Sequence, residues 1–267
     1  MDDDPDTTNH DLTIRWLGHA SASVSVGGTT LLFDPVVRWR IAHLRRRTRV
    51  ADHAIEGVDA VLVSHAHHDH LDLGSLRRVR RRSPDAAWHA PRGAARILER
   101  AGFAPVVRRS LGDDVAVGDL HVSAVPAAHG GERLRYARDE HGAEAVGFVV
   151  TLPNGIRVWF AGDTAYDDIL ERVGQVDVAL VPVGGWWRTL GPGHMDSANA
   201  ARALELVGAR VAIPIHWGTY HPIGLYRAMR PIWYAPAHEL ERLAPASVDV
   251  RVLEVGEATT IRDLTPR

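Results

Sequence analysis

Ser64-His65-Ala66-His67-His68-Asp69-His70-Leu71-Asp72 is the most informative segment of this 267-residue sequence. It follows an apolar run, residues 60–63, which predicts a buried strand. Imidazoles and a carboxylate, both zinc-binding groups, therefore gather where a strand ends and a loop begins. His65 and His67 alternate and can reach one ion, while Asp69 and His70 turn towards a second. The alternative is a solvated histidine-rich tract, but it does not explain the amphipathic helix that is predicted directly afterwards.

Further candidate donors follow apolar runs later in the chain. They are His129 after residues 122–126, Asp163 after residues 157–161 and His216 after residues 211–215. In layered α/β folds, ligands collect at the loops beyond the carboxyl ends of strands. We therefore expect these donors and the histidine cluster to form one shared site. An isolated histidine or aspartate would more often be an ordinary loop or turn residue.

Composition limits the classes of protein. A chain with 45% hydrophobic residues can bury a large core, and one domain is favoured because the candidate ligands come from both halves. With 31 basic and 33 acidic residues the chain is nearly neutral, so a general nucleic-acid-binding surface is not implied. The chain contains no cysteine, which excludes disulfides and thiolate zinc ligands.

The N-terminal segment carries no recognisable signal. Residues 1–11 are acidic and polar and predict a disordered lead, which is followed by a folded domain of residues 12–267. No basic segment precedes an apolar core there, and no run approaches about 18 apolar residues. We therefore expect a cytoplasmic protein without a transmembrane segment, for which peripheral contact with a membrane stays open.

Hydrophobic periodicity predicts alternating strands and helices. Strands are expected at residues 12–17, 21–26, 29–33, 60–63, 85–90, 106–107, 115–117, 120–125, 178–183, 211–215 and 249–255, with a hairpin of residues 144–151 and 156–161. Helices are expected at residues 73–82, 92–101, 167–173 and 197–207. Residues 222–243 are expected to form a cap over the cleft. Helix, sheet, sheet, helix is the simplest layering of these elements.

The segment His65-Ala66-His67-His68-Asp69-His70 matches the HxHxDH signature of the metallo-β-lactamase superfamily. Gly162-Asp163-Thr164 and His216-Trp217-Gly218-Thr219 resemble later motifs of that family, and His129 falls in the same order. Further segments resemble the N-acylphosphatidylethanolamine phospholipase D-like branch, although related lactonases share several of them. They are Trp16-Leu17-Gly18-His19-Ala20, Phe33-Asp34-Pro35 and Ala161-Gly162-Asp163-Thr164-Ala165-Tyr166. The resemblance covers residues 12–256, nearly the whole chain.

The resemblance implies an α/β fold, a four-layer αββα sandwich in a single domain, with two metal ions. The expected ligands are His65, His67 and His129 for one ion, Asp69, His70 and His216 for the second, and Asp163 as a bridge between them. The ions would be Zn²⁺, with Mn²⁺ or Fe²⁺ as alternatives. Two such ions lower the pKa of a bound water from about 15.7 towards about 7, which yields a hydroxide nucleophile at neutral pH. Asp69 would also help to orient that nucleophile.

Three more residues have two interpretations each. Asp34 is either a turn starter before Pro35 or a carboxylate that hydrogen-bonds a ligand histidine. His19 is either satisfied within a turn, or supports the ligands from behind or lines the pocket. His194 either caps a helix N-terminus or, as the resembled branch implies, contacts the substrate or leaving group.

Residues 37–50 form the most basic stretch, with arginines at 38, 40, 45, 46, 47 and 49. Such a run is usually a solvated face, but it is alternatively a mobile loop that receives an anionic substrate or touches an acidic membrane. Arginine forks suit phosphate, so Arg38 and Arg40 are candidate substrate contacts. Trp187 and Tyr220 are candidate pocket residues, although aromatics more often belong to the core.

These observations predict a metal-dependent hydrolase for a small-molecule or lipid-like anionic substrate, with a phosphodiester preferred. A lactone or carboxyl ester is the main alternative, because a substrate that bears phosphate would suit the same arginines. A metal-binding redox module is a weaker alternative, since diiron relatives carry Glu where this chain has His67. The sequence does not indicate an oligomeric state.

Overall fold

A computed structural model describes residues 11–131, 144–184, 190–227, 230–262 and 264–266. The first sheet has the order β17-β1-β2-β3-β6-β7-β8. Its strands are β1 (Leu12–Gly18), β2 (Ser21–Val26), β3 (Thr29–Phe33), β6 (Ala60–Leu62), β7 (Ala87–Pro91), β8 (Val106–Arg109) and β17 (Ala258–Ile261). Pairing is antiparallel from β17 to β3 and parallel from β3 to β8.

The second sheet has the order β16-β14-β13-β12-β11-β10-β9. Its strands are β9 (Asp114–Val117), β10 (Leu120–Gly130), β11 (Glu144–Thr151), β12 (Arg157–Phe160), β13 (Val178–Pro182), β14 (Val211–Ile215) and β16 (Asp249–Val250). The predicted hairpin is confirmed: β11 pairs antiparallel with β12, and the Asn154 side chain accepts a hydrogen bond from the Ile156 amide across the turn. Parallel pairing then joins β12 to β13, β14 and β16.

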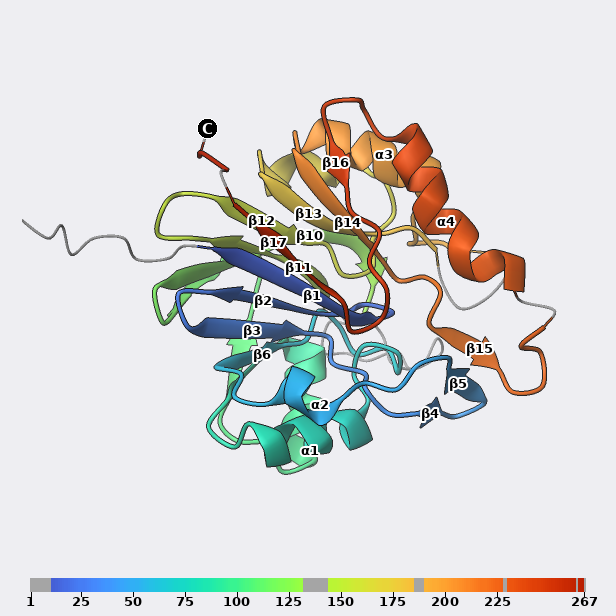
Figure 1. Cartoon of the computed structure of the whole chain (residues 1–267). Coiled ribbons are helices and arrows are strands. Elements are labelled where there is room, and N and C mark those ends of the chain that lie inside the picture. Colours follow the sequence, from blue (N-terminus) through green and yellow to red (C-terminus); the bar gives the residue numbers. More distant parts are fainter. Residues whose placement is uncertain (1–10, 132–143, 185–189, 228–229, 263, 267) are drawn as a thin grey trace, which may run out of the picture.

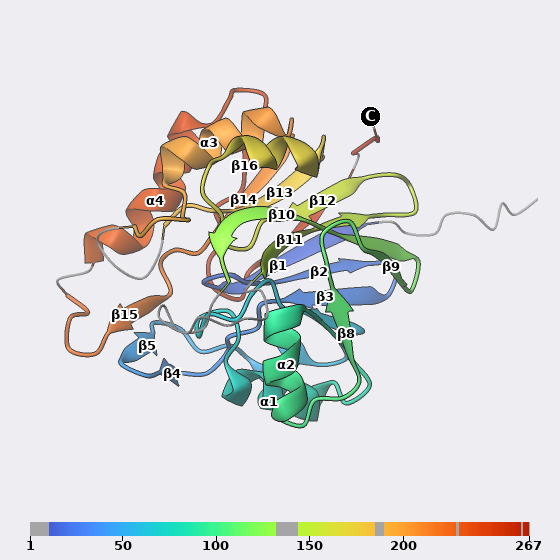
Figure 2. The same ribbon diagram turned by 180° about the vertical axis from the view of Figure 1, so that it is seen from behind.

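Helices cover the outer face of each sheet, as Figure 1 shows and as the reverse view in Figure 2 confirms. The helices are α1 (Leu73–Arg82) and α2 (Arg92–Arg100) on the first sheet, α3 (Ser197–Leu206) and α4 (Arg230–Leu243) on the second, and the short 3₁₀ helices η1 (Asp52–Ile55) and η2 (Asp168–Val173). The inner faces of the two sheets meet in an apolar core, in which Phe33 of β3 stacks on Phe160 of β12 at 4.7 Å between ring centroids. The predicted αββα sandwich is therefore confirmed.

Several expected elements differ from the structure. His129 was expected in a loop after the strand at residues 120–125, but β10 continues to Gly130 with an irregular register after Pro126. Only Asp249–Val250 of the predicted strand at 249–255 is extended, and β17, which was not predicted, closes the first sheet instead. The predicted cap at 222–243 is also wrong in part, because α4 packs on α3 and β14 as an outer-layer helix.

A small third sheet has the order β15-β5-β4 and projects from the sandwich in both views (Figures 1 and 2). Its strands are β4 (Arg40–Ile41), β5 (Leu44–Arg46) and β15 (Tyr220–Pro222). The basic stretch is therefore a paired, folded ribbon. Its inner face packs Ile41, Leu44 and Tyr220 into a cluster with Val36.

No helix among the described residues is long and apolar enough to cross a membrane. Residues 1–10 of the expected lead at residues 1–11 lie outside the described part of the chain.

Candidate metal centre

Loops and strand ends at one end of the sandwich carry the candidate ligands. The His65–His70 segment follows β6 and ends where Asp72 caps α1, its carboxylate accepting a hydrogen bond from the Ser75 amide at 2.7 Å. His129 lies at the end of β10, and His216 directly follows β14. The donors that the sequence places at strand ends therefore lie at the same end of the sandwich, as expected.

Asp163 follows β12 through a tight turn at Gly162. Gly162 has a φ of +62°, and a Cβ there would lie 3.0 Å from the Cβ of Ser64. A larger residue would therefore strain the backbone and press on the strand end that leads into His65. The glycine brings the Asp163 carboxylate to the histidine cluster.

The Asp163 carboxylate lies at the centre of five imidazoles. Its Oδ2 is 3.1 Å from His70 Nε2 and 3.3 Å from His194 Nε2. The same oxygen is 3.9 Å from Nε2 of both His65 and His129. Oδ1 faces His216 Nε2 at 3.2 Å. All five imidazoles therefore point at one carboxylate, which is only 1% exposed.

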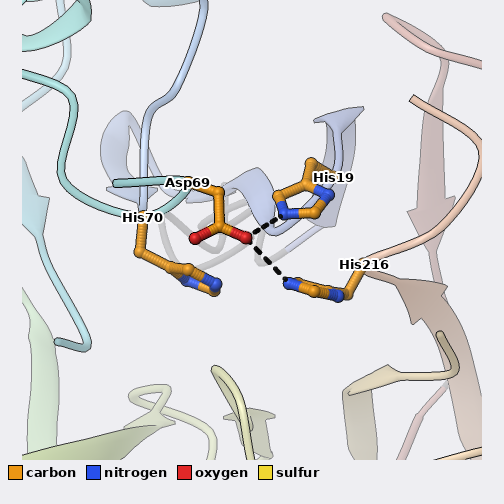
Figure 3. A group of neighbouring side chains, drawn as sticks. All are labelled: His19, Asp69, His70 and His216. Carbon is orange, nitrogen blue, oxygen red and sulfur yellow. Dashed lines mark hydrogen bonds and ion pairs between the residues drawn. The ribbon is translucent and has the colours of Figure 1, made fainter. Parts of the chain in front are cut away.

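Two groups of donor atoms meet at this carboxylate. In the first, one atom from each residue lies within 4.8 Å of the others; it comprises His65, His67, His129 and Asp163. The second meets the same criterion and comprises His19, Asp69, His70 and His216, whose side chains converge in Figure 3. A third such group joins Asp34 to His65 of the first group and His70 of the second. The expected two ligand sets are brought together, and His19 joins the second.

His19 is closer to the centre than its sequence context indicated. Its Nε2 is 2.9 Å from Asp69 Oδ2, which is also 3.6 Å from His216 Nε2 (Figure 3). Burial and then the neighbouring His216 lower the pKa of His19 to about 4. The imidazole is therefore neutral at neutral pH and can bind a metal ion directly or donate its Nε2 proton to Asp69.

The outer nitrogens of the candidate ligands are engaged by protein groups. His70 Nδ1 lies 2.7 Å from Asp34 Oδ2, and His216 Nδ1 lies 2.7 Å from the carbonyl oxygen of Gly184. His129 Nδ1 lies 2.8 Å from the Gly193 carbonyl oxygen. Such partners receive the Nδ1 proton and leave Nε2 as the lone-pair donor.

Five of the atoms that point inward lack hydrogen bonds, whereas His129 Nε2 lies 3.2 Å from His67 Nδ1 and His19 Nε2 contacts Asp69. Nε2 of His65, His70 and His216 and both carboxylate oxygens of Asp163 are buried without a hydrogen-bond partner in the described part of the chain. Buried polar atoms are normally hydrogen-bonded, so a group of unpartnered donor atoms around one point requires an explanation. Metal ions satisfy it, because imidazole nitrogen and carboxylate oxygen are zinc donors.

The charges in the cluster fit the same conclusion. Burial by itself would raise the pKa of Asp163, but His216 and His70 outweigh it and hold that pKa well below its ordinary value. Burial lowers the pKa of His65 well below its ordinary value and that of His129 to about 4. Burial also lowers the pKa of His70, but Asp163 outweighs it and raises that pKa well above its usual range. Positive charge is therefore favoured beside the Asp163 carboxylate, while His65 and His129 are neutral imidazoles that can bind a metal ion.

Backbone strain is concentrated at this site. Among the described residues, four other than glycine have a positive φ, and three of them are His19 (+55°), Asp34 (+40°) and His216 (+63°). Such conformations are unfavourable for residues with a Cβ and tend to persist at functional sites. At this site the strained backbone conformations direct the side chains of these three residues towards the cluster.

The predicted contacts in the basic stretch lie outside this inner cluster. Arg38 is 52% exposed and lies 3.5 Å from Asp72, while Arg40 donates to the Ala42 carbonyl oxygen. Tyr220 is buried with its ring against His19 at 5.4 Å between centroids, and burial raises its pKa to about 12. Trp187 lies outside the described residues.

A cavity of about 1000 Å³ lies away from the cluster. It is lined by residues at the starts of β1 and β10, including Asp11 and Leu120. His19 and His129 lie at the other ends of those two strands. The cavity and the candidate metal ligands therefore lie at opposite ends of the sandwich. We assign the functional site to the end with the donor atoms.

Asp34 provides a test of the outer contacts. It is fully buried, and its carboxylate accepts hydrogen bonds from the Ser64 amide and hydroxyl as well as facing His70. Asp34→Asn removes the charge that orients His70, so we expect zinc affinity to fall by about ten- to a hundredfold. Competition against a chromophoric chelator measures it. An affinity equal to that of the wild type would contradict the orienting role.

Comparison with known proteins agrees with this arrangement. The beta-lactamase superfamily domain matches residues 29–217. A UPF0173 metal-dependent hydrolase of Methanopyrus kandleri is 32% identical over 250 residues, 92% of this chain and 99% of the relative. The N-acyl-phosphatidylethanolamine-hydrolyzing phospholipase D 1 of Caenorhabditis elegans is 28% identical over 264 residues, 90% of this chain and 72% of the relative. A solved metallo hydrolase of Ignicoccus hospitalis has a TM-score of 0.71 at 25% identity, covering 94% of this chain and 99% of that one.

Proposed function

Since the chain belongs to the beta-lactamase superfamily and is a metal-dependent hydrolase, we propose that it uses two zinc ions to hydrolyse a phosphodiester in a phospholipid-like substrate. The observation that carries the two-ion proposal is the shared position of Asp163 between two groups of donors. Both of its carboxylate oxygens, and Nε2 of His65, His70 and His216 around it, have no hydrogen-bond partner in the described chain. The Caenorhabditis elegans relative, whose name states that it hydrolyses N-acyl-phosphatidylethanolamine, supports the substrate class.

Each ion would have its own set of side chains. His65, His67 and His129 would hold the first, Asp69, His70 and His216 the second, and Asp163 both; manganese or iron could occupy the same donors. When bound, the ions would activate water as the nucleophile and stabilise charge on an oxygen of the scissile group. No serine nucleophile or organic cofactor is then required.

The remaining steps belong to protein groups. Asp34, Gly184 and Gly193 fix the orientation of ligand imidazoles through the Nδ1 contacts described above. Asp69 would orient the attacking water with one carboxylate oxygen while His19 holds the other, Oδ2, at 2.9 Å. The contact with His19 would thus hold the Asp69 carboxylate in the orientation that directs the water toward the substrate.

His194 is the group that we assign to the leaving side. Its Nδ1 lies 3.2 Å from each of two carbonyl oxygens, those of Gly191 and Pro192, and its side chain is 22% exposed. Burial lowers its pKa, but the negatively charged Asp163 carboxylate, 3.3 Å from Nε2, outweighs burial and raises it. An imidazole that is held at Nδ1 and is partly open to solvent can give a proton from Nε2 to a departing alcohol.

Turnover of a chromogenic phosphodiester tests the function. We expect hydrolysis by the purified protein, loss of it after treatment with a chelator, and recovery after addition of Zn²⁺, because the nucleophile depends on the metal. Hydrolysis of glycerophospholipids in mixed micelles would then define the headgroup. If zinc-loaded protein cleaves lactones or carboxyl esters but no phosphodiester, the substrate class is wrong while the metal centre stands.

A further inference from the structure

The outer face of the β15–β5–β4 sheet is strongly basic. We call this surface, together with residues 38–49, residues 223–227 and Tyr234 of α4, the basic face. Register pairs His221 with Arg45 and Arg45 with Arg40, so these three side chains share the face opposite the buried Ile41 and Leu44. The exposed arginines of the region are Arg38, Arg40, Arg45, Arg49 and Arg227.

Acidic residues are absent from the segments that build the basic face. Residues 35–51 and 217–238 contain no aspartate or glutamate. The chain as a whole has 33 acidic residues, so two acid-free segments that pair in one sheet mark a local departure from its neutral balance. Some exposed arginines elsewhere have acidic partners, as Arg82 does in Asp52 and Arg108 in Glu99, and Arg38 lies 3.5 Å from Asp72 beside α1. The basic face therefore presents positive charge that its own segments do not neutralise.

Large apolar side chains are exposed on the same face. Of nine exposed large hydrophobic residues in the described part of the chain, five belong here: Trp39, Ile223, Leu225, Tyr226 and Tyr234, each 39–44% exposed. Two of the arginines stack on these rings, Arg49 on Trp39 at 5.1 Å and Arg47 on Tyr234 at 4.7 Å to the ring centroid. Aliphatic and aromatic tips beside cations are the composition of a membrane-interface surface.

A small cavity of about 170 Å³ lies within the basic face. Its lining includes Trp39, Arg45, Arg47, His221 and Tyr226. Arginine forks and an imidazole around a small space suit a phosphate group, which accepts several charge-assisted hydrogen bonds.

The basic face and the metal centre share a segment of chain. His216 is four residues before Tyr220, where β15 begins. Arg47 of the ribbon donates through Nη1 to the Gly218 carbonyl oxygen at 2.9 Å, and its amide donates to the Thr219 carbonyl oxygen. A partner bound to the basic face would therefore lie beside the loop that carries a metal ligand.

We propose that the basic face docks the protein on an anionic lipid bilayer, with its arginines against lipid phosphates and with Ile223 and Leu225 inserted among the headgroups. A nucleic acid or another soluble polyanion would use the arginines but not the exposed aliphatic side chains, so a lipid surface fits both features. The docking does not depend on which bond the metal centre hydrolyses.

Co-sedimentation of the zinc-loaded full chain with lipid vesicles tests the proposal. We expect binding to phosphatidylcholine vesicles that contain about a third phosphatidylglycerol, and little binding to pure phosphatidylcholine, because anionic lipid attracts arginine near the surface. The double variant Arg45→Glu with Arg49→Glu should bind at least about tenfold more weakly. Ile223→Ser with Leu225→Ser keeps every charge and should also weaken binding measurably.

Arg77→Glu with Arg81→Glu is the matched control, because it makes the same change in net charge at exposed positions of α1. Its binding should stay within about twofold of the wild type, and all variants should keep the wild-type unfolding temperature. The proposal is overturned if the wild type does not bind anionic vesicles at low salt or if the control loses as much affinity as Arg45→Glu with Arg49→Glu. Wild-type vesicle binding by the Ile223 and Leu225 variant, together with binding of single-stranded RNA to the wild type, would instead identify a general polyanion site.

Discussion

Asp163→Asn is expected to lower turnover of a phosphodiester by at least about 1000-fold, more than the ten- to hundredfold that loss of an outer contact costs. In the described part of the chain, this one carboxylate faces Nε2 of His65, His70, His129, His194 and His216 together. An asparagine of the same size removes the negative charge at that point and offers one acceptor oxygen in place of two. Turnover and zinc content by elemental analysis should fall together.

Asp168→Asn is the control for this variant. Asp168 is an exposed carboxylate five residues later, in the first turn of η2. It should keep wild-type turnover and zinc content. If Asp163→Asn retained two zinc ions and turnover within about tenfold of the wild type, Asp163 could not be the shared donor, and the two-ion assignment would be wrong.

The grouping of the candidate donors was predictable from the sequence because its signals are local. The histidine cluster follows a short apolar strand, and each later donor stands at or just beyond the end of another such strand. Parallel strands β12, β13 and β14 have their carboxyl ends at one edge of a sheet, so Asp163 and His216 are brought together by topology alone. The order and direction of the strands therefore suffice to predict which donors lie close together.

The parts that the sequence did not predict depend on distant contacts. His19 reaches Asp69, 50 positions away, because its amide contacts the Thr219 hydroxyl and its carbonyl oxygen accepts from the His216 amide. No periodicity in the first strands indicates either contact. His129 was expected in a loop beyond a strand end, whereas pairing of Gly130 with Glu144 of β11 continues the strand past it.

Among the arginines of residues 37–50, Arg46 departs from both expectations for this stretch, a solvated face and a mobile loop. Arg46 is 1% exposed, although it stands among five other arginines. In β5 its side chain faces inward opposite Tyr220, and Arg45 faces outward opposite His221. Strand alternation separates neighbouring arginines in this way, but the pattern is readable only once the ribbon is known to pair.

Arg46→Met is expected to destabilise the protein by at least about 3 kcal/mol. The guanidinium donates to the carbonyl oxygens of Leu17, Val36 and Thr48. Methionine fills much of the same volume but donates nothing, and each hydrogen bond to a charged group contributes about 1.5–3 kcal/mol. Val36 would keep the Tyr220 hydroxyl as a donor, so the largest loss falls on the Leu17 carbonyl. Urea unfolding followed by circular dichroism measures the change in the free energy of unfolding.

The same variant should also weaken the metal centre, because Arg46 supports it from behind. Leu17 precedes Gly18, whose φ of +97° leads into His19, and a Cβ on Gly18 would lie 2.5 Å from Arg46 Nη2. Arg46 also lies beside the Tyr220 hydroxyl at 3.4 Å, and the Tyr220 ring contacts His19. Releasing these contacts frees His19 and with it Asp69, so zinc affinity should fall even under conditions where the variant is folded.

Arg45→Met separates this effect from the loss of one positive charge. Arg45 is the neighbouring arginine on the exposed side of β5, so its replacement should change the free energy of unfolding by no more than about 0.5 kcal/mol. Equal stability of both variants would show that the three carbonyls find other donors and that Arg46 is not structurally required. A destabilised Arg46→Met protein with wild-type zinc affinity would instead limit the role of Arg46 to the ribbon, and the coupling between the ribbon and His19 would be wrong.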